Sequence, residues 1–140
     1  MLAVPSSPSP EKEKLYQEEL MEHFKYPHNK KKLQSPSFTA GRDNPSCGDH
    51  IIIEGIIQGD TIVDLGFSGS GCVISQATAS MLTQSCKNKT IDYLLALTKD
   101  DIIKLVGIQM GPTRLKCALL SLQVLHEGIL RYNAQTKRMN

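Results

Sequence analysis

Three short segments carry residue types that bind metal ions and transfer sulfur. A turn of sequence NPSCGDH holds Cys47 and Asp49, a thiol and a carboxylate two residues apart. Further thiols end the sequences GSGC, at Cys72, and RLKC, at Cys117. Thiolates and carboxylates are ligands of zinc, and an accessible thiolate is also a nucleophile. These residues suggest one metal- and sulfur-handling site, provided that the fold brings the three segments together.

The first two segments are predicted to meet at one end of a β-hairpin. Residues 50–57 are rich in isoleucine, the turn sequence QGD follows, and residues 61–68 alternate apolar with polar side chains. The outer ends of an antiparallel hairpin are neighbours, with strands about 5 Å apart. We therefore expect Cys47 and Asp49 to lie beside Cys72.

Apolar periodicity predicts that helices make up most of the remaining chain. The expected helices cover residues 11–25, 72–87, 90–97, 98–106 and 112–132. Residues 35–43 are interpreted as a loop or an edge strand. Cys72 falls at the start of the second helix, where unpaired N–H groups and the positive end of the helix dipole favour a thiolate.

Length and composition are typical of one folded domain with terminal tails. The chain has 140 residues, of which 40% are hydrophobic and 21% charged, so it can bury an ordinary core. Residues 1–10, MLAVPSSPSP, are rich in proline and serine and are predicted to be disordered. Residues 11–132 are the predicted domain, and residues 133–140 a polar tail.

Several classes of function are disfavoured by the same sequence. A net charge of +2 is too small to indicate a nucleic-acid partner, and no nucleic-acid-binding signature is present. No apolar run approaches the roughly 20 residues that span a bilayer, and the N-terminus lacks the apolar core of a signal peptide. We therefore expect a cytoplasmic protein with no membrane partner.

The four cysteines each have more than one interpretation. In a reducing compartment they are expected to be metal-binding, catalytic or buried, and the absence of a CxxC pair excludes a zinc finger. Cys72 alone is equally well explained as a small residue at a tight strand–helix junction. Cys117 alone is better explained as a core residue of an apolar helix. Asp49 alone is better explained as a turn carboxylate, whereas Cys47 sits in a Pro/Gly turn that argues against burial.

Two cations near Cys117 could support its chemistry. Arg114 lies three residues before it on the same helix face, and can lower the thiol pKa or pair with a bound anion. Lys116 is rotated by about 100° from Cys117 and is a less direct partner.

The remaining candidate ligands are expected to lie outside the site. Cys86 is 14 residues beyond Cys72, or roughly 21 Å along a continuous helix. His126 should face away from Cys117, and His50 should point to the opposite side of its strand from Asp49. The basic run NKKK at residues 29–32 is either a solvated loop or a docking patch for an acidic partner.

Taken in order, these residues resemble the iron–sulfur cluster assembly scaffolds of the NifU N-terminal/IscU/SufU type. The matching pieces fall between residues 15 and 129. They are LY, HFKYP and NK in the first helix and its exit, NPSCGD, GSGCVISQA and RLKCA. One such piece would be weakly specific, but all of them in order, with three cysteines in register, are highly specific.

The resemblance implies an α+β fold, in which a small antiparallel sheet of about three strands packs against a set of helices. It also implies that Cys47, Asp49, Cys72 and Cys117 are the ligands. The implied cofactors are a transient Fe–S cluster, [2Fe–2S] in the first place, or Zn²⁺, because four such ligands suit both.

The resemblance further implies sulfur chemistry and partners. Cys47 and Cys117 are the candidate sulfur acceptors, with Arg114 and Lys116 in supporting roles. The implied partners are a cysteine desulfurase of the SufS/IscS type and downstream Fe–S carriers or apo-protein acceptors.

Three functions stay open at this point. The first is a scaffold that accepts sulfur and builds a cluster, and the second a zinc-dependent sulfurtransferase that relays persulfide sulfur. The third is an adaptor in which zinc is purely structural. Lys116 replaces the histidine that IscU-like members carry, as in SufU-like members, but only 44 residues separate Cys72 from Cys117, close to the IscU length.

Overall fold

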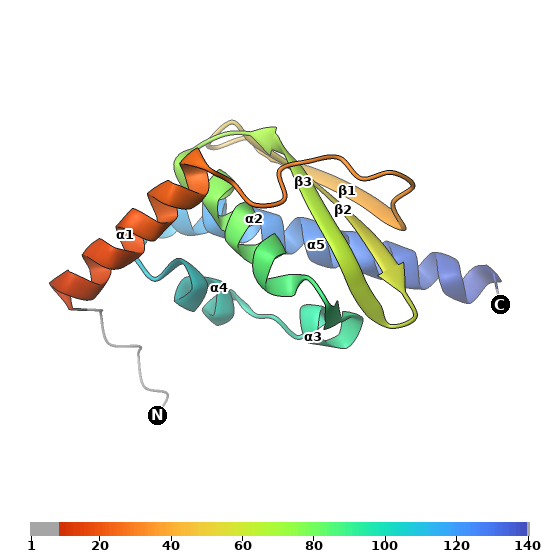
Figure 1. Ribbon diagram of the computed structural model, residues 1–140. Coiled ribbons are helices and arrows are strands. Elements are labelled where there is room, and N and C mark those ends of the chain that lie inside the picture. The colour runs from red at the N-terminus through yellow and green to blue at the C-terminus, as the bar shows by residue number, and fades with distance from the viewer. Residues whose placement is uncertain (1–8, 140) are drawn as a thin grey trace, which may run out of the picture.

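The computed structural model describes residues 9–139 and has an α+β architecture (Figure 1). Its elements are α1 (Pro10–Lys25), β1 (Phe38–Asn44), β2 (Asp49–Gln58), β3 (Thr61–Ser70), α2 (Val73–Cys86), β4 (Lys89–Thr90), α3 (Ile91–Leu95), α4 (Lys99–Val106) and α5 (Pro112–Met139). Of the segment predicted to be disordered, residues 1–8 lie outside the described residues.

The sheet confirms the predicted fold class. Its strands follow the order β1-β2-β3-β4, and every neighbouring pair is antiparallel. The hairpin of β2 and β3 forms as predicted, with His50 opposite Ser70 at its open end and Gln58 opposite Thr61 at its turn. The segment interpreted as a loop or edge strand contributes β1 at one edge, and the two-residue β4 supplies the fourth strand.

The helices pack around α2, which is the most deeply buried of them. Every side chain of α2 from Ile74 to Thr83 is buried, and α2 contacts α1, α5 and β3. The long helix α5 runs along the sheet and packs on β1 and β2 (Figure 1). The core is mainly aliphatic, although Phe38 and Phe67 are buried in it, and β2 alone contributes Ile51, Ile53 and Ile57.

The last helix is longer than predicted. It was expected to end near Tyr132, but α5 continues to Met139, so the polar residues 133–139 are helical. These residues include no glycine or proline, and most of them are good helix formers, so a helix already nucleated by packing can extend into solvent. The boundaries of the domain themselves stay a prediction.

The end of α1 is fastened to α2 by hydrogen bonds around Ser80. The Ser80 hydroxyl lies 2.8 Å from His23 Nδ1 and accepts the His28 N–H, also at 2.8 Å. Burial lowers the pKa of His23 and so favours its neutral ring. Three residues along α2, Thr83 accepts the side-chain amide of Asn29 at 3.2 Å.

Part of the basic run is already paired within the chain. Lys31 forms an ion pair with Asp64 at 3.4 Å, and Lys87 contacts the same carboxylate at 3.1 Å. The role of this run as a docking patch stays a prediction. Among the described residues, no helix is both long enough and apolar enough to cross a membrane.

Candidate metal and sulfur site

The first thiol is presented by a tight turn between β1 and β2. The backbone N–H groups of Cys47 and Gly48 both donate to the carbonyl of Asn44, at 3.2 and 3.0 Å. Gly48 has a φ of +68°, a left-handed conformation that favours glycine. The turn reverses the chain within four residues and leaves the Cys47 side chain half-buried at the surface.

The carboxylate of Asp49 is held at the open end of the hairpin. Asp49 pairs with Asn44 across β1 and β2, and its side chain is only 1% exposed. Its Oδ1 accepts the backbone N–H of Cys72 at 2.8 Å. Gly71 makes this approach possible, because a Cβ on Gly71 would lie 2.2 Å from Asp49 Oδ1.

Cys72 occupies the position predicted for it at the start of α2. It is the N-cap residue, and its Sγ accepts the N–H of Ser75 at 3.4 Å. The same sulfur lies 3.7 Å from Asp49 Oδ2. The hairpin has therefore joined the first two segments, as the strand pattern predicted.

Cys117 completes the cluster from α5. Its side chain is 3% exposed, and its Sγ lies 2.9 Å from Cys47 Sγ. Burial, together with the neighbours Cys47, Asp49 and Cys72, raises the pKa of the Cys117 thiol. In the metal-free protein Cys117 is therefore a protonated donor to Cys47.

The two supporting cations lie at the surface near this thiol. Arg114 and Lys116 are both exposed at the start of α5. The net pKa of Cys117 is raised by its burial and its neighbours, so any lowering by Arg114 is the smaller effect. Pairing of Arg114 with a bound anion stays a prediction, as does any role of Lys116.

The donor set has the chemistry of a zinc or iron site. One sulfur each from Cys47 and Cys117 and one oxygen of Asp49 all lie within 4.8 Å of one another. Two ligands of one tetrahedral zinc ion, at about 2.0–2.3 Å from it, are about 3.3–3.8 Å apart, so side-chain adjustments of about 1 Å suffice. Cys72 is not part of this closest group but contacts Asp49 directly. All four predicted ligands are thus brought together, and metal binding by them stays a prediction.

The other candidate ligands lie apart from the cluster. Cys86 is fully buried at the far end of the unbroken helix α2, and burial raises its thiol pKa to about 11. His50 pairs with Asp43 on β1, and His126 donates from Nε2 to the carbonyl of Leu94 at 2.8 Å. Asn44 is a site residue for which no role was predicted, although an asparagine before proline is typical of a side-chain-capped turn.

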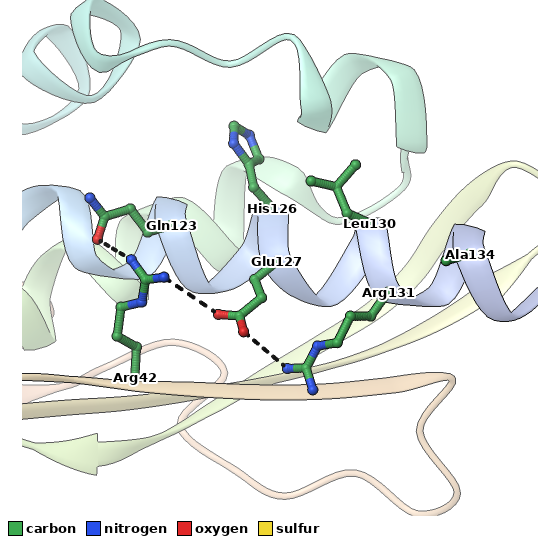
Figure 2. A pocket seen from close by; sticks show the side chains of 7 residues that line it. All are labelled: Arg42, Gln123, His126, Glu127, Leu130, Arg131 and Ala134. Atoms are coloured by element: carbon green, nitrogen blue, oxygen red, sulfur yellow. Dashed lines mark hydrogen bonds and ion pairs between the residues drawn. The ribbon is translucent and has the colours of Figure 1, made fainter.

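A shallow hollow of about 510 Å³ lies further along α5 (Figure 2). Arg42 reaches across from β1 to Gln123 at 3.3 Å and Glu127 at 4.0 Å, and Arg131 contacts the same Glu127 at 3.6 Å. Gln123, the first residue of α5 that lines the hollow, is six positions beyond Cys117, or roughly 9 Å along the helix. The hollow is therefore separate from the thiol cluster, and its two arginines share the single carboxylate of Glu127.

Comparison with known proteins gives consistent matches over nearly the whole described chain. The sequence model of the NifU-like N terminal domain matches residues 15–139. The zinc-dependent sulfurtransferase SufU of Bacillus subtilis is 37% identical, and the match covers 84% of this chain and 90% of that protein. The iron–sulfur cluster assembly scaffold protein IscU of Aquifex aeolicus is 35% identical, over 84% of this chain and 75% of that protein.

A solved structure matches at the level of the fold as well. The crystal structure of a putative iron–sulfur cluster assembly scaffold protein for the SUF system from Fervidobacterium islandicum superposes with a TM-score of 0.72 at 25% identity. The match covers 80% of this chain and 94% of that chain.

Proposed function

The chain belongs to the NifU-like N-terminal domain family, and from that premise we propose that it accepts sulfur from a cysteine desulfurase for iron–sulfur cluster assembly. The observation that carries the proposal is the convergence of Cys47, Asp49 and Cys117 within 4.8 Å, with one of the thiols half-exposed. The desulfurase is of the SufS/IscS type, and Fe–S carriers or apo-proteins receive the product. The cytoplasm, where thiols stay reduced, is the proposed compartment.

Accessibility selects Cys47 as the first sulfur acceptor. Cys47 is half-buried on a surface turn, whereas Cys117 is 3% exposed and protonated in the metal-free protein. Cys72 is engaged at the N-terminus of α2, where its sulfur accepts the Ser75 N–H. A partner's persulfide can reach the Cys47 sulfur with the least rearrangement of the chain.

The transfer step is a thiol–disulfide type exchange. The Cys47 thiolate attacks the outer sulfur of the desulfurase persulfide, a new S–S bond forms on Cys47, and the desulfurase cysteine leaves as a thiolate. No external oxidant or reductant is needed for this step. Cys117, 2.9 Å from the Cys47 sulfur, is positioned to contact the delivered sulfur next.

The donor set is suited to holding Zn²⁺, iron or a nascent [2Fe–2S] cluster, with Cys47, Asp49, Cys72 and Cys117 as ligands. When bound, such a metal keeps the thiols deprotonated and ready for exchange. One oxygen ligand among sulfur ligands makes the contents easier to release. Asp49 is accordingly the ligand that allows the site to release its metal ion or cluster to an acceptor.

A second candidate function is a zinc-dependent sulfurtransferase that relays sulfur without building a cluster. It is favoured by the 37% identity to a protein of that name and by Lys116 immediately before Cys117. Both functions share the uptake of sulfur at Cys47, and they differ in whether iron is retained afterwards.

Substitution of Asp49 separates a transfer site from purely structural zinc. We expect Asp49→Asn to retain an acceptor for the Cys72 N–H while weakening the metal ligand, so that zinc is lost about tenfold faster without loss of the fold. The rate of persulfide uptake and the lifetime of any cluster should change as well. Asp49→Ala also leaves the Cys72 N–H unpaired and should cost about 1–3 kcal/mol of stability in addition.

The measurements are zinc transfer to a chromophoric chelator, persulfide formation followed by mass spectrometry, and thermal unfolding. An adaptor with structural zinc predicts a different pattern. In that case both variants lose stability, and neither sulfur uptake nor cluster lifetime responds, which would overturn the transfer role of Asp49.

A further inference from the structure

Asn44 contacts the proposed sulfur acceptor through its side chain. Its Nδ2 lies 3.5 Å from Cys47 Sγ, and its Oδ1 accepts the backbone N–H of Ser46 at 3.3 Å. The Asn44 carbonyl also accepts the N–H groups of Cys47 and Gly48. One residue therefore fixes both the backbone of the turn and the surroundings of its sulfur.

The orientation of the Asn44 carboxamide follows from this network. A backbone N–H can only donate, so the atom that faces Ser46 must be the carboxamide oxygen. The NH₂ group is then directed to the other side, toward Cys47 Sγ. The contact is an N–H···S hydrogen bond with a defined donor.

The Asn44 donor matters most when the site holds a metal ion. In the described part of the chain, the hydrogen bonds found to the Cys47 sulfur come from Cys117, at 2.9 Å, and from Asn44. Cys117 would have to be deprotonated to bind a metal ion, and it would then no longer donate to the Cys47 sulfur. The Asn44 N–H is then the donor that remains for the Cys47 sulfur.

We propose that Asn44 is a positioning residue, which holds the Cys47 sulfur toward the site through an N–H···S hydrogen bond. The proposal rests on the proposed function, because it assigns Asn44 a task in metal holding and sulfur acceptance. Hydrogen bonds from outside the ligand set are known to orient ligands and strengthen their binding.

Two substitutions separate this task from a role in the turn alone. In Asn44→Ser, the hydroxyl can still accept the Ser46 N–H, as serine does in such turns. The serine side chain is shorter and has no N–H group to donate to the Cys47 sulfur. In Asn44→Ala, both contacts are lost. Asn133→Ser is the matched control, because Asn133 lies on α5, 16 residues beyond Cys117, or roughly 24 Å along the helix.

The first measurement is the rate at which zinc-loaded protein passes zinc to a chromophoric chelator. We expect about a tenfold faster loss in both Asn44→Ser and Asn44→Ala, and an unchanged rate in Asn133→Ser. The second measurement uses metal-free protein and follows alkylation of Cys47 by iodoacetamide at one pH, resolved by peptide mass spectrometry. We expect the rate to differ about threefold from the wild type in both Asn44 variants, because the N–H donor no longer contacts the sulfur, and to be unchanged in Asn133→Ser.

Amide hydrogen exchange at residues 46–48 reports on the turn in the same proteins. If Asn44→Ser behaves as the wild type and only Asn44→Ala differs, Asn44 serves the turn alone and the proposal is wrong. Wild-type behaviour of both variants would overturn it as well. If the wild type takes up no sulfur from a desulfurase, the proposed function fails, but alkylation of Cys47 still decides the role of Asn44.

Discussion

Cys47→Ser is expected to abolish the uptake of sulfur from a cysteine desulfurase. The serine hydroxyl is not ionised near neutral pH and cannot attack a persulfide, Cys86 and Cys117 are buried, and the Cys72 sulfur is engaged by the Ser75 N–H. Uptake is measured by incubating the protein with desulfurase and cysteine and following the added mass of one sulfur atom on each cysteine-containing peptide. The signal on the Cys47 peptide should fall to the background seen without desulfurase.

Two further variants make this result specific. Cys86→Ala removes a thiol that is fully buried at the other end of α2, so sulfur uptake at Cys47 should be unchanged. Cys117→Ser removes the nearest neighbour of the Cys47 sulfur but not the acceptor, so loading of Cys47 should persist. If Cys117→Ser abolishes uptake and Cys47→Ser does not, the assignment of Cys47 as first acceptor is wrong.

Gly71→Ala is expected to disrupt the site, although Gly71 is not itself a proposed ligand. A Cβ at this position would lie 2.2 Å from Asp49 Oδ1 and 2.9 Å from Asp49 Cα, and the φ of +146° is strained for alanine. Asp49 must then move, which breaks its 2.8 Å bond with the Cys72 N–H. We expect a loss of about 3 kcal/mol in the free energy of unfolding and a loss of stoichiometric zinc binding.

The stability change is measured as a shift of the urea midpoint at constant m value. Gly59→Ala is the matched control, because Gly59 also has a positive φ, +64°, but no atom lies within 4 Å of a Cβ built there. Its cost should be the conformational strain alone, about 1–2 kcal/mol, and zinc binding should be retained. Equal effects of the two variants on zinc binding would mean that the close approach of Gly71 to Asp49 does not shape the site.

Local sequence patterns were sufficient to predict the half of the site that the hairpin builds. The isoleucine-rich and alternating runs indicated β2 and β3, and the antiparallel connection then required Cys47 and Asp49 to lie beside Cys72. The start of α2 at Cys72 was also predictable, because Gly-Ser-Gly interrupts the strand and a helical period follows. In each case the contact is set by a hairpin or by the start of a helix, and local sequence patterns predict both.

The position of Cys117 beside Cys47 could not be predicted from local sequence patterns. Its helix was predicted, and its own surroundings favoured a core cysteine, which agrees with an exposure of 3%. The 2.9 Å contact with Cys47 depends on how α5 packs against β1, β2 and α2, and no local pattern encodes that packing. Only the resemblance to a family placed Cys117 among the ligands before the structure was known.

The orientation of side chains was also not predicted by the sequence patterns. Asn44 was noted as part of a motif, but its contact with the Cys47 sulfur depends on the direction of one carboxamide. Arg114 can lower the pKa of Cys117 or pair with a bound anion, but burial among Cys47, Asp49 and Cys72 has the larger effect on this pKa and raises it. Helical spacing alone does not reveal how deeply a thiol is buried.

The measurement that tests the central claim most directly uses the unmodified protein. The protein is purified without oxygen, analysed for metal and acid-labile sulfide, and incubated with a cysteine desulfurase, cysteine, ferrous iron and a thiol reductant. We expect sulfur to appear first on Cys47 and then as acid-labile sulfide with iron, in a cluster that an apo-protein can remove. Stoichiometric zinc and faster desulfurase turnover, with no cluster in the presence of iron, would contradict the scaffold and leave the sulfurtransferase. A protein that binds no metal and takes up no sulfur under these conditions would contradict both.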